Sequence, residues 1–105
     1  MIKVADIQIN GILHFGAATN FINVFNDVKD NVYFIYDEDK EYYKFENIIK
    51  LFKQNAENPV ISLFTDDETK KEQIFEILKN TETIYVGMNR PQDIIKLNQT
   101  TIKIL

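Results

Sequence analysis

The hydrophobic pattern of the chain changes period within the stretch Ile9-Asn10-Gly11-Ile12-Leu13-His14-Phe15-Gly16-Ala17-Ala18-Thr19-Asn20-Phe21. An extended apolar run ends at Gly16, and Phe21, Phe25 and Val28 then recur at helical spacing. A change of period from two to about 3.6 indicates a strand that leads into a helix. We therefore interpret this stretch as the junction between the first strands of a sheet and its first helix.

The rest of the chain alternates between strand and helix patterns. Continuous β-branched and aromatic runs indicate buried strands, apolar residues at helical spacing indicate helices, and Asn-Gly favours a tight hairpin turn. The expected elements are strands at 2–9 and 12–15 joined by a turn at Asn10-Gly11, a helix at 17–28, a strand at 32–36, a helix at 43–56, a strand at 60–64, a helix at 66–79, a strand at 84–86, a short helix from Pro91 and an extended segment at 102–105. This order predicts one α/β domain over residues 1–105, with a mixed sheet that has an N-terminal antiparallel hairpin followed by strand-helix alternation.

Two finer expectations follow from these patterns. Thr65 followed three residues later by Glu68 forms a capping-box motif, so Thr65 is expected to cap the helix after it. The buried core is expected to include six large apolar residues, namely Phe15, Phe21, Phe25, Phe34, Ile49 and Phe64.

Composition narrows the class of function. Acidic residues outnumber basic ones by 16 to 12, which gives a net charge of −4. No run of Lys or Arg supplies the basic face that nucleic-acid binders need, so no nucleic-acid partner is expected. The absence of Cys excludes disulfides and cysteine metal sites. Neither a signal-peptide pattern nor an apolar run of membrane-spanning length is found, so we expect a cytoplasmic protein without membrane insertion.

The residues Gly11, Leu13, Phe15 and Ala18, with Phe21 three positions later, resemble the start of a STAS domain. The variant most similar in this motif is the cytosolic domain of sulfate-permease-type anion transporters. The bacterial anti-sigma-factor antagonists share that fold. The resemblance implies an α/β regulatory domain that binds proteins, and the expected order of elements is compatible with it over nearly the whole chain.

One departure from the family concerns the phosphorylation switch. The antagonist branch carries Asp-Ser-Ser-Gly or a close relative at the start of a helix, where a partner kinase phosphorylates the second hydroxyl. The corresponding stretch here, Tyr42–Ile48, contains no Ser, Thr or Gly. Depending on the alignment, Glu46 or Asn47 occupies the acceptor position. The kinase-controlled switch is therefore not expected in this chain, although Glu46 could imitate the charged state.

We expect a non-enzymatic interaction domain with a protein partner, and the sequence leaves open whether it also forms a homo-oligomer. The expected partner surface is the acidic loop and the start of the following helix, comprising Asp37, Glu38, Asp39, Tyr42, Tyr43, Glu46 and Asn47. One of the two adjacent tyrosines is expected to anchor in the core instead. No catalytic residue, cofactor site or metal site is expected.

Other sequence features have simpler explanations. His14 is the only histidine and has no Cys or second His nearby for a metal site or triad. Asn89-Arg90 before Pro91 offers a weak anion-binding signal. Asp37, Asp39, Asp66 and Asp67 follow two successive strands, where an α/β sheet binds ligands. An alternative function is therefore a small metal- or phosphate-binding domain, and a further one is a phage or mobile-element protein that blocks a host factor.

Overall fold

A computed structural model describes residues 1–10, 19, 21–36, 40–53, 59–87 and 101–105. Helical backbone is present at residues 19 and 21–23. The elements after the first strand include three short 3₁₀ turns, labelled η. In chain order they are β1 (Ile2–Asn10), η1 (Lys29–Asn31), β2 (Val32–Tyr36), β3 (Tyr43–Lys44), η2 (Phe45–Asn47), α2 (Ile48–Lys53), β4 (Val60–Thr65), η3 (Glu68–Lys70), α3 (Lys71–Gly87) and β5 (Thr101–Ile104).

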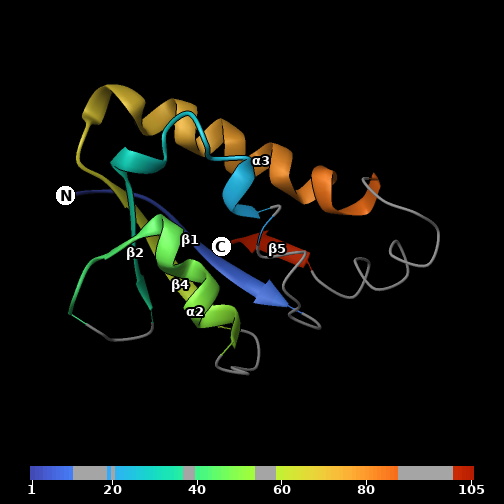
Figure 1. Ribbon diagram of the computed structural model, residues 1–105. Coiled ribbons are helices and arrows are strands. Elements are labelled where there is room, and N and C mark those ends of the chain that lie inside the picture. Colours follow the sequence, from blue (N-terminus) through green and yellow to red (C-terminus); the bar gives the residue numbers. More distant parts are fainter. Residues whose placement is uncertain (11–18, 20, 37–39, 54–58, 88–100) are drawn as a thin grey trace.

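The five strands form one sheet in the order β3-β2-β4-β1-β5, and every neighbouring pair is antiparallel (Figure 1). β4 is the central strand. It pairs with β1 on one side, where Ile7 lies opposite Ile61, and with β2 on the other, where Phe34 lies opposite Leu63. The four strands β2-β4-β1-β5 have the order and directions of the split βαβ arrangement. β3 and α2 are added between β2 and β4.

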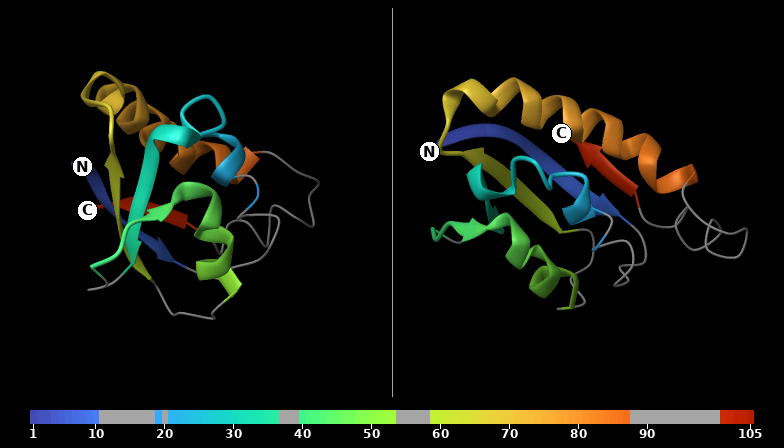
Figure 2. Two further views of the ribbon diagram at one scale, coloured as in Figure 1. Left: turned by 60° about the vertical axis from the view of Figure 1, so that its left-hand side comes forward. Right: turned by 45° about the horizontal axis from the view of Figure 1, so that its top comes forward.

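The helices lie on one side of this sheet (Figure 2). α3 runs along β1 and β5, and α2 lies beside β2 and β4 (Figures 1 and 2). The buried hydrophobic residues form a single cluster between the helices and the sheet. That cluster consists of Ile7, Ile9, Phe21, Phe25, Val28, Val32, Phe34, Phe45, Ile48, Ile61, Leu63, Ile74, Leu78 and Ile102.

Three phenylalanine rings pack the segment that contains Phe21 and Phe25 against η2, which begins with Phe45. The ring of Phe21 makes edge contacts with Phe25 and Phe45, at centroid distances of 5.5 Å and 5.3 Å. The ring centroids of Phe25 and Phe45 lie 4.6 Å apart. All three side chains are fully buried. Aromatic pairs in such tilted and edge-on arrangements contribute about 0.5–1.5 kcal/mol beyond the burial of their area.

The α/β class is confirmed, but the strand directions differ from the mixed sheet that was expected. Helix-strand alternation does make successive strands run the same way, as β1 and β2 do, and as β4 and β5 do. In each case a third strand of opposite direction lies between the two, so no described pair of neighbours is parallel. The hairpin partner expected at residues 12–15 lies outside the described residues.

The strand predicted at residues 84–86 is wrong, because these residues belong to α3. Asn80 was taken as a helix stop, but asparagine in a helix interior costs only a fraction of a kcal/mol. No Gly or Pro interrupts the segment before Gly87, where the helix ends. Glycine is a common residue at the end of a helix because it tolerates the left-handed conformation that often follows.

Other helix predictions are corrected at their ends. The helix expected at 43–56 begins instead as the short strand β3, passes through η2 and becomes α2 only at Ile48. The helix expected at 17–28 gives way to turns at residues 24–28. The short helix from Pro91 lies outside the described residues. The strands expected at 2–9, 32–36 and 60–64, and the extended C-terminal segment, are confirmed as β1, β2, β4 and β5.

The predicted core is confirmed at Phe21, Phe25 and Phe34, which are buried. Ile49 and Phe64 are only half-buried, and Phe15 lies outside the described residues. The strand β4 was interpreted as covered on both faces, whereas Phe64 lies on the face opposite the helices. Neighbouring Ile48, and not Ile49, points fully into the core.

The phenylalanine cluster can be tested by truncation. Phe25→Ala should lower the free energy of unfolding by about 3–5 kcal/mol, because it leaves a cavity between the two rings that Phe25 contacts. Urea denaturation followed by circular dichroism would measure this loss. Asn26→Ala changes an exposed neighbour and should cost about 0.5 kcal/mol or less. Equal losses in the two variants would contradict the packing described here.

Candidate functional site

The face of the sheet opposite the helices is the candidate site. Along β4, Ile61, Leu63 and Thr65 are fully buried, whereas Ser62 and Phe64 between them are half-exposed. This alternation is the normal period of a strand with one face toward the core. Within the described part of the chain no helix lies over the second face (Figure 2). We call this second surface the open face.

The strand register arranges the side chains of the open face in three rows. The first row, at the end of the sheet near η3, runs across four strands as Lys44, Tyr33, Phe64 and Lys3. The second row is Ile35, Ser62 and Asp6. The third row is Val60, Gln8 and Lys103. Apart from Ser62, the residues of these rows on β2 and β4 are aromatic or aliphatic, and those on the strands on either side are polar.

An additional aromatic ring extends this apolar area. The ring of Tyr42, just before β3, packs edge-on against Phe64 with a centroid distance of 5.0 Å. The Tyr42 side chain remains 44% exposed, and Val60 is 40% exposed. Four large hydrophobic residues of the described chain are exposed, and the other two are the first and last residues of the sequence, Met1 and Leu105. Exposed apolar area within the ordered sheet is therefore concentrated on the open face.

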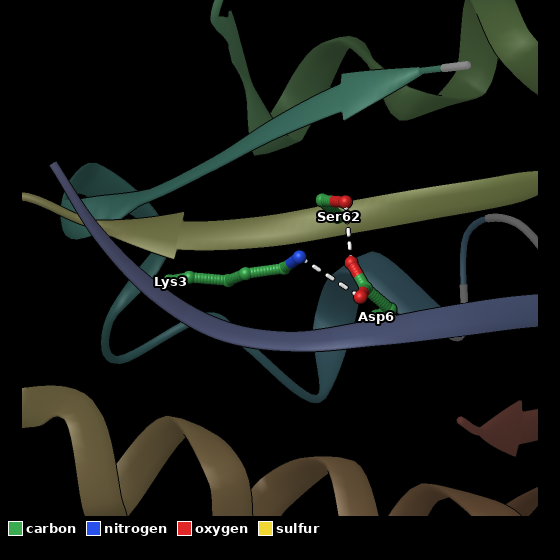
Figure 3. A network of polar contacts seen from close by, with 3 residues as sticks. All are labelled: Lys3, Asp6 and Ser62. Carbon is green, nitrogen blue, oxygen red and sulfur yellow. Dashed lines mark hydrogen bonds and ion pairs between the residues drawn. The ribbon is translucent and has the colours of Figure 1, made fainter. Parts of the chain in front are cut away.

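A small polar network occupies the β1 side of the open face (Figure 3). Ser62 Oγ donates a hydrogen bond to Asp6 Oδ1, and Lys3 Nζ lies 2.9 Å from Asp6 Oδ2. Partial burial of the carboxyl raises the pKa of Asp6, but the Ser62 hydrogen bond and the Lys3 ammonium outweigh that effect. The pKa of Asp6 is therefore below its ordinary value, and the carboxylate is ionised and neutralised locally by Lys3.

A second polar network ties together the chain at the end of β4. Asn31 Nδ2 donates to Asp66 Oδ1 at 2.9 Å, and Lys70 Nζ donates to Asn31 Oδ1 at 2.7 Å. The hydroxyl of Tyr33 donates to Asp66 Oδ2 at the longer distance of 3.4 Å. These bonds connect η1, β2 and η3. They hold the Tyr33 side chain in the first row of the open face, between Lys44 and Phe64.

The residue that caps the helix lies two positions after Thr65, the predicted cap. Asp67 caps η3, because its Oδ1 accepts hydrogen bonds from the backbone N–H and the hydroxyl of Thr69, at 3.0 Å and 2.6 Å. These two bonds lower the pKa of Asp67. Thr65 does not cap the helix. Its hydroxyl oxygen accepts a bond from the backbone N–H of Asp67 at 3.1 Å, which shapes the turn before the cap.

The residues predicted to bind a partner separate in the structure. Tyr42 is exposed and lies on the open face. Tyr43 is half-buried on the opposite face, where its ring lies 5.5 Å from that of Phe34, so the expectation that one tyrosine anchors in the core is met by Tyr43. Glu46 is exposed in the first turn of η2, and Asn47 is half-buried beside it. Asp37, Glu38 and Asp39 lie outside the described residues.

The alternative site built from acids at one edge of a parallel sheet does not receive support from the topology. β2 and β4 are antiparallel, with Val32 opposite Thr65 and Tyr36 opposite Ile61. Asp66 and Asp67 follow the end of β4, at the edge where β2 begins. β2 ends at Tyr36, opposite Ile61 near the start of β4, and so at the other end of the sheet. No group of three or more potential metal ligands converges among the described residues, and His14 and Asn89-Arg90 lie outside them.

Sequence reasoning missed the open face because it treated two strands as covered on both sides. The available signal was the type of residue at alternate positions. Tyr33 and Ser62 carry polar groups, whereas Val32 and Phe34, like Ile61 and Leu63, are entirely apolar. One residue with a polar group at an alternate position of each strand is a weak signal for a strand with one face in water.

No protein-family model, curated protein or solved structure matches the chain. None of the helices in the described part of the chain is long and apolar enough to cross a membrane.

The Asp6 network predicts a pH-dependent contribution to stability. Because the pKa of Asp6 is lowered by folding, its contribution is present above the unfolded-state pKa of about 3.9 and is lost as the pH falls through the folded-state value. Asp6→Asn should therefore destabilise the protein at neutral pH, by less than about 1 kcal/mol because the pair is half-exposed. At about pH 2 the difference from wild type should shrink.

Urea denaturation of both proteins at the two pH values would measure this difference. Asp27→Asn is the control, because Asp27 is exposed and has no ion-pair partner among the described residues. A loss for Asp6→Asn that is the same at both pH values would show that the carboxylate charge contributes nothing.

Proposed function

We propose that this chain is a non-catalytic interaction domain that binds a protein partner through the open face. The observation that carries the proposal is the aromatic and aliphatic area formed by exposed Tyr42 and Val60 and half-exposed Tyr33, Ile35 and Phe64, on a sheet face that no helix of the described residues covers. The second face of an antiparallel sheet is usually polar when it faces only water. Contiguous exposed apolar area on a small domain is typical of a binding surface.

The chemistry of this area fits a protein-protein interface. Such interfaces have apolar centres that are enriched in tyrosine and phenylalanine, and rims that are polar. Here Tyr33, Tyr42 and Phe64 form the centre, and Lys3, Lys44, Lys103 and Gln8 surround it. Large aromatic side chains at the centre of an interface are also the residues whose truncation most often weakens binding.

The aromatic side chains are held in place before any partner arrives. Tyr42 packs against Phe64, and the hydroxyl of Tyr33 is bonded to Asp66, which Asn31 fixes in turn. A partner would therefore not need to immobilise these groups, which otherwise costs about 0.5–1.5 kcal/mol for each flexible side chain. A prearranged surface of this kind favours binding.

The polar groups of the open face favour binding over catalysis. The neighbouring base of Ser62 is the Asp6 carboxylate, to which its hydroxyl donates a hydrogen bond. Asp6 is paired with Lys3 and has a lowered pKa, so it is a poor proton acceptor near neutral pH. The resemblance of the N-terminal motif to STAS domains, which regulate other proteins by binding, is a second line of support for a regulatory role.

Removing the aromatic centre tests the proposal. Tyr42→Ser/Phe64→Ser should abolish capture of a partner from an extract of the organism that encodes this protein, or weaken the captured complex by about tenfold or more, since aromatic hot spots contribute 2 kcal/mol or more. Affinity capture with mass spectrometry would identify the partner, and a binding titration would measure the loss.

Phe75→Ser is the matched control, because Phe75 is a half-exposed phenylalanine on α3, on the other side of the molecule. Circular dichroism would confirm that both variants are folded. A partner that is retained by the double variant and lost with Phe75→Ser would place the binding surface on the helices and refute the proposal.

A further inference from the structure

The charges of the open face differ in sign from those of the whole chain. The net charge of the protein is −4, yet the rows of the open face contain three lysines, Lys3, Lys44 and Lys103, and one carboxylate, Asp6. This grouping is not visible in the sequence, because successive lysines of the three lie about forty to sixty positions apart. Pairing of β3, β2, β4, β1 and β5 brings them to one surface.

Two of these lysines are free to meet a partner. Lys3 forms an ion pair with Asp6, which neutralises both groups. Lys44 and Lys103 are exposed, and neither has an ion-pair partner among the described residues. They lie on the two outer strands, β3 and β5, so the apolar centre of the open face lies between them. The rim of the site is therefore cationic.

This pattern does not favour a second copy of the chain as the occupant. When two identical sheet faces pack together about a two-fold axis, each face must supply the groups that the other requires. The only carboxylate in the rows of the open face is already paired with Lys3, so the face offers none to Lys44 or Lys103 of another copy. Bringing such lysines together would cost energy through like-charge repulsion.

The centre of the face also distinguishes between anionic partners. Single-stranded nucleic acids bind to sheets on which successive bases stack on aromatic rings. Here Ile35 and Val60 provide aliphatic surface in the second and third rows, and Phe64 is covered edge-on by Tyr42. A peptide segment with apolar side chains fits this centre better.

We infer that the open face, as the binding surface of the proposed function, takes an extended acidic segment of another protein, with apolar side chains in its middle and carboxylates at both ends. Lys44 and Lys103 would meet the two acidic ends. They are separated by four strand spacings across the sheet and by four residues along it, which is on the order of 23 Å. About seven extended residues span that distance.

Three synthetic peptides of about nine extended residues provide the test. The first has two glutamates at each end and a centre of alternating phenylalanine, isoleucine and serine. The second has glutamine, and the third lysine, in place of every glutamate. Each is titrated at low salt into the full-length ¹⁵N-labelled protein while backbone amide signals are followed by NMR. The glutamate peptide should shift amides of Tyr33, Lys44, Phe64 and Lys103, with a Kd about fivefold or more below that of the glutamine peptide.

A charge-reversed variant isolates the two lysines. Lys44→Glu/Lys103→Glu should remove the advantage of the glutamate peptide over the glutamine peptide. Lys29→Glu/Lys50→Glu changes the net charge of the protein by the same amount at two exposed lysines outside the open face. This control should keep the advantage, because its charges lie away from the site. Loss of the advantage in both variants would show that only the overall charge matters, and would overturn the inference.

The remaining outcomes separate this inference from the proposed function. If all three peptides shift the same open-face amides with equal affinity, the open face binds peptides but the acidic partner is wrong. If no peptide shifts these amides, both the inference and the proposed surface fail. A thymidine oligonucleotide that binds at these amides more tightly than the glutamate peptide would overturn the inference in favour of nucleic acid. Concentration-dependent broadening of the same amides without peptide would overturn it in favour of self-association.

Discussion

The alternation of side chains along β4 is the constraint on which the rest of the structure depends. β4 is the central strand, and its two neighbours are bonded to it in registers that place Ile7 opposite Ile61 and Phe34 opposite Leu63. The face that β4 turns toward the helices is thus also the apolar face of β1 and β2. A slip of one residue in either pairing would exchange buried and exposed side chains along the whole strand.

Because β4 and its neighbours turn their apolar side chains to the same face, a single layer of helices is sufficient to bury the core. The apolar face of the sheet is covered by α3, which supplies Ile74 and Leu78, and by the segments that carry Phe21, Phe25 and Phe45. Burial of Phe45 also has a consequence at the other face of the sheet. It anchors η2 directly after β3, and so holds the outer strand that carries Lys44 against β2. Burial of Phe45 in the core therefore fixes the position of Lys44 at the rim of the open face.

The polar groups at the end of β4 form local hydrogen bonds that stabilise the fold and fix Tyr33 of the open face. Asp67 caps η3 and Asp66 binds Asn31 and Tyr33, so two acids that resemble a ligand site in the sequence are engaged in local hydrogen bonds. Lys44 and Lys103, which have no ion-pair partner among the described residues, lie on either side of an apolar centre, and the acidic nature of the partner is inferred from this arrangement.

The sequence by itself determined the local elements, because hydrophobic period and chain punctuation are local properties. It identified β1, β2 and β4, the helical stripe of Phe21 and Phe25, and a helix at 66–79, which the structure has as η3 followed by α3. It failed at residues 84–86, where weak local preferences favoured a strand but a helix without an internal breaker continued. The tertiary structure alone decided which strands are neighbours. Strand direction follows from each connection, but insertion of β4 between β1 and β2 depends on long-range packing that no local pattern encodes. The same pairing decided the site, because Lys3, Lys44 and Lys103 share a face only once the five strands are in register.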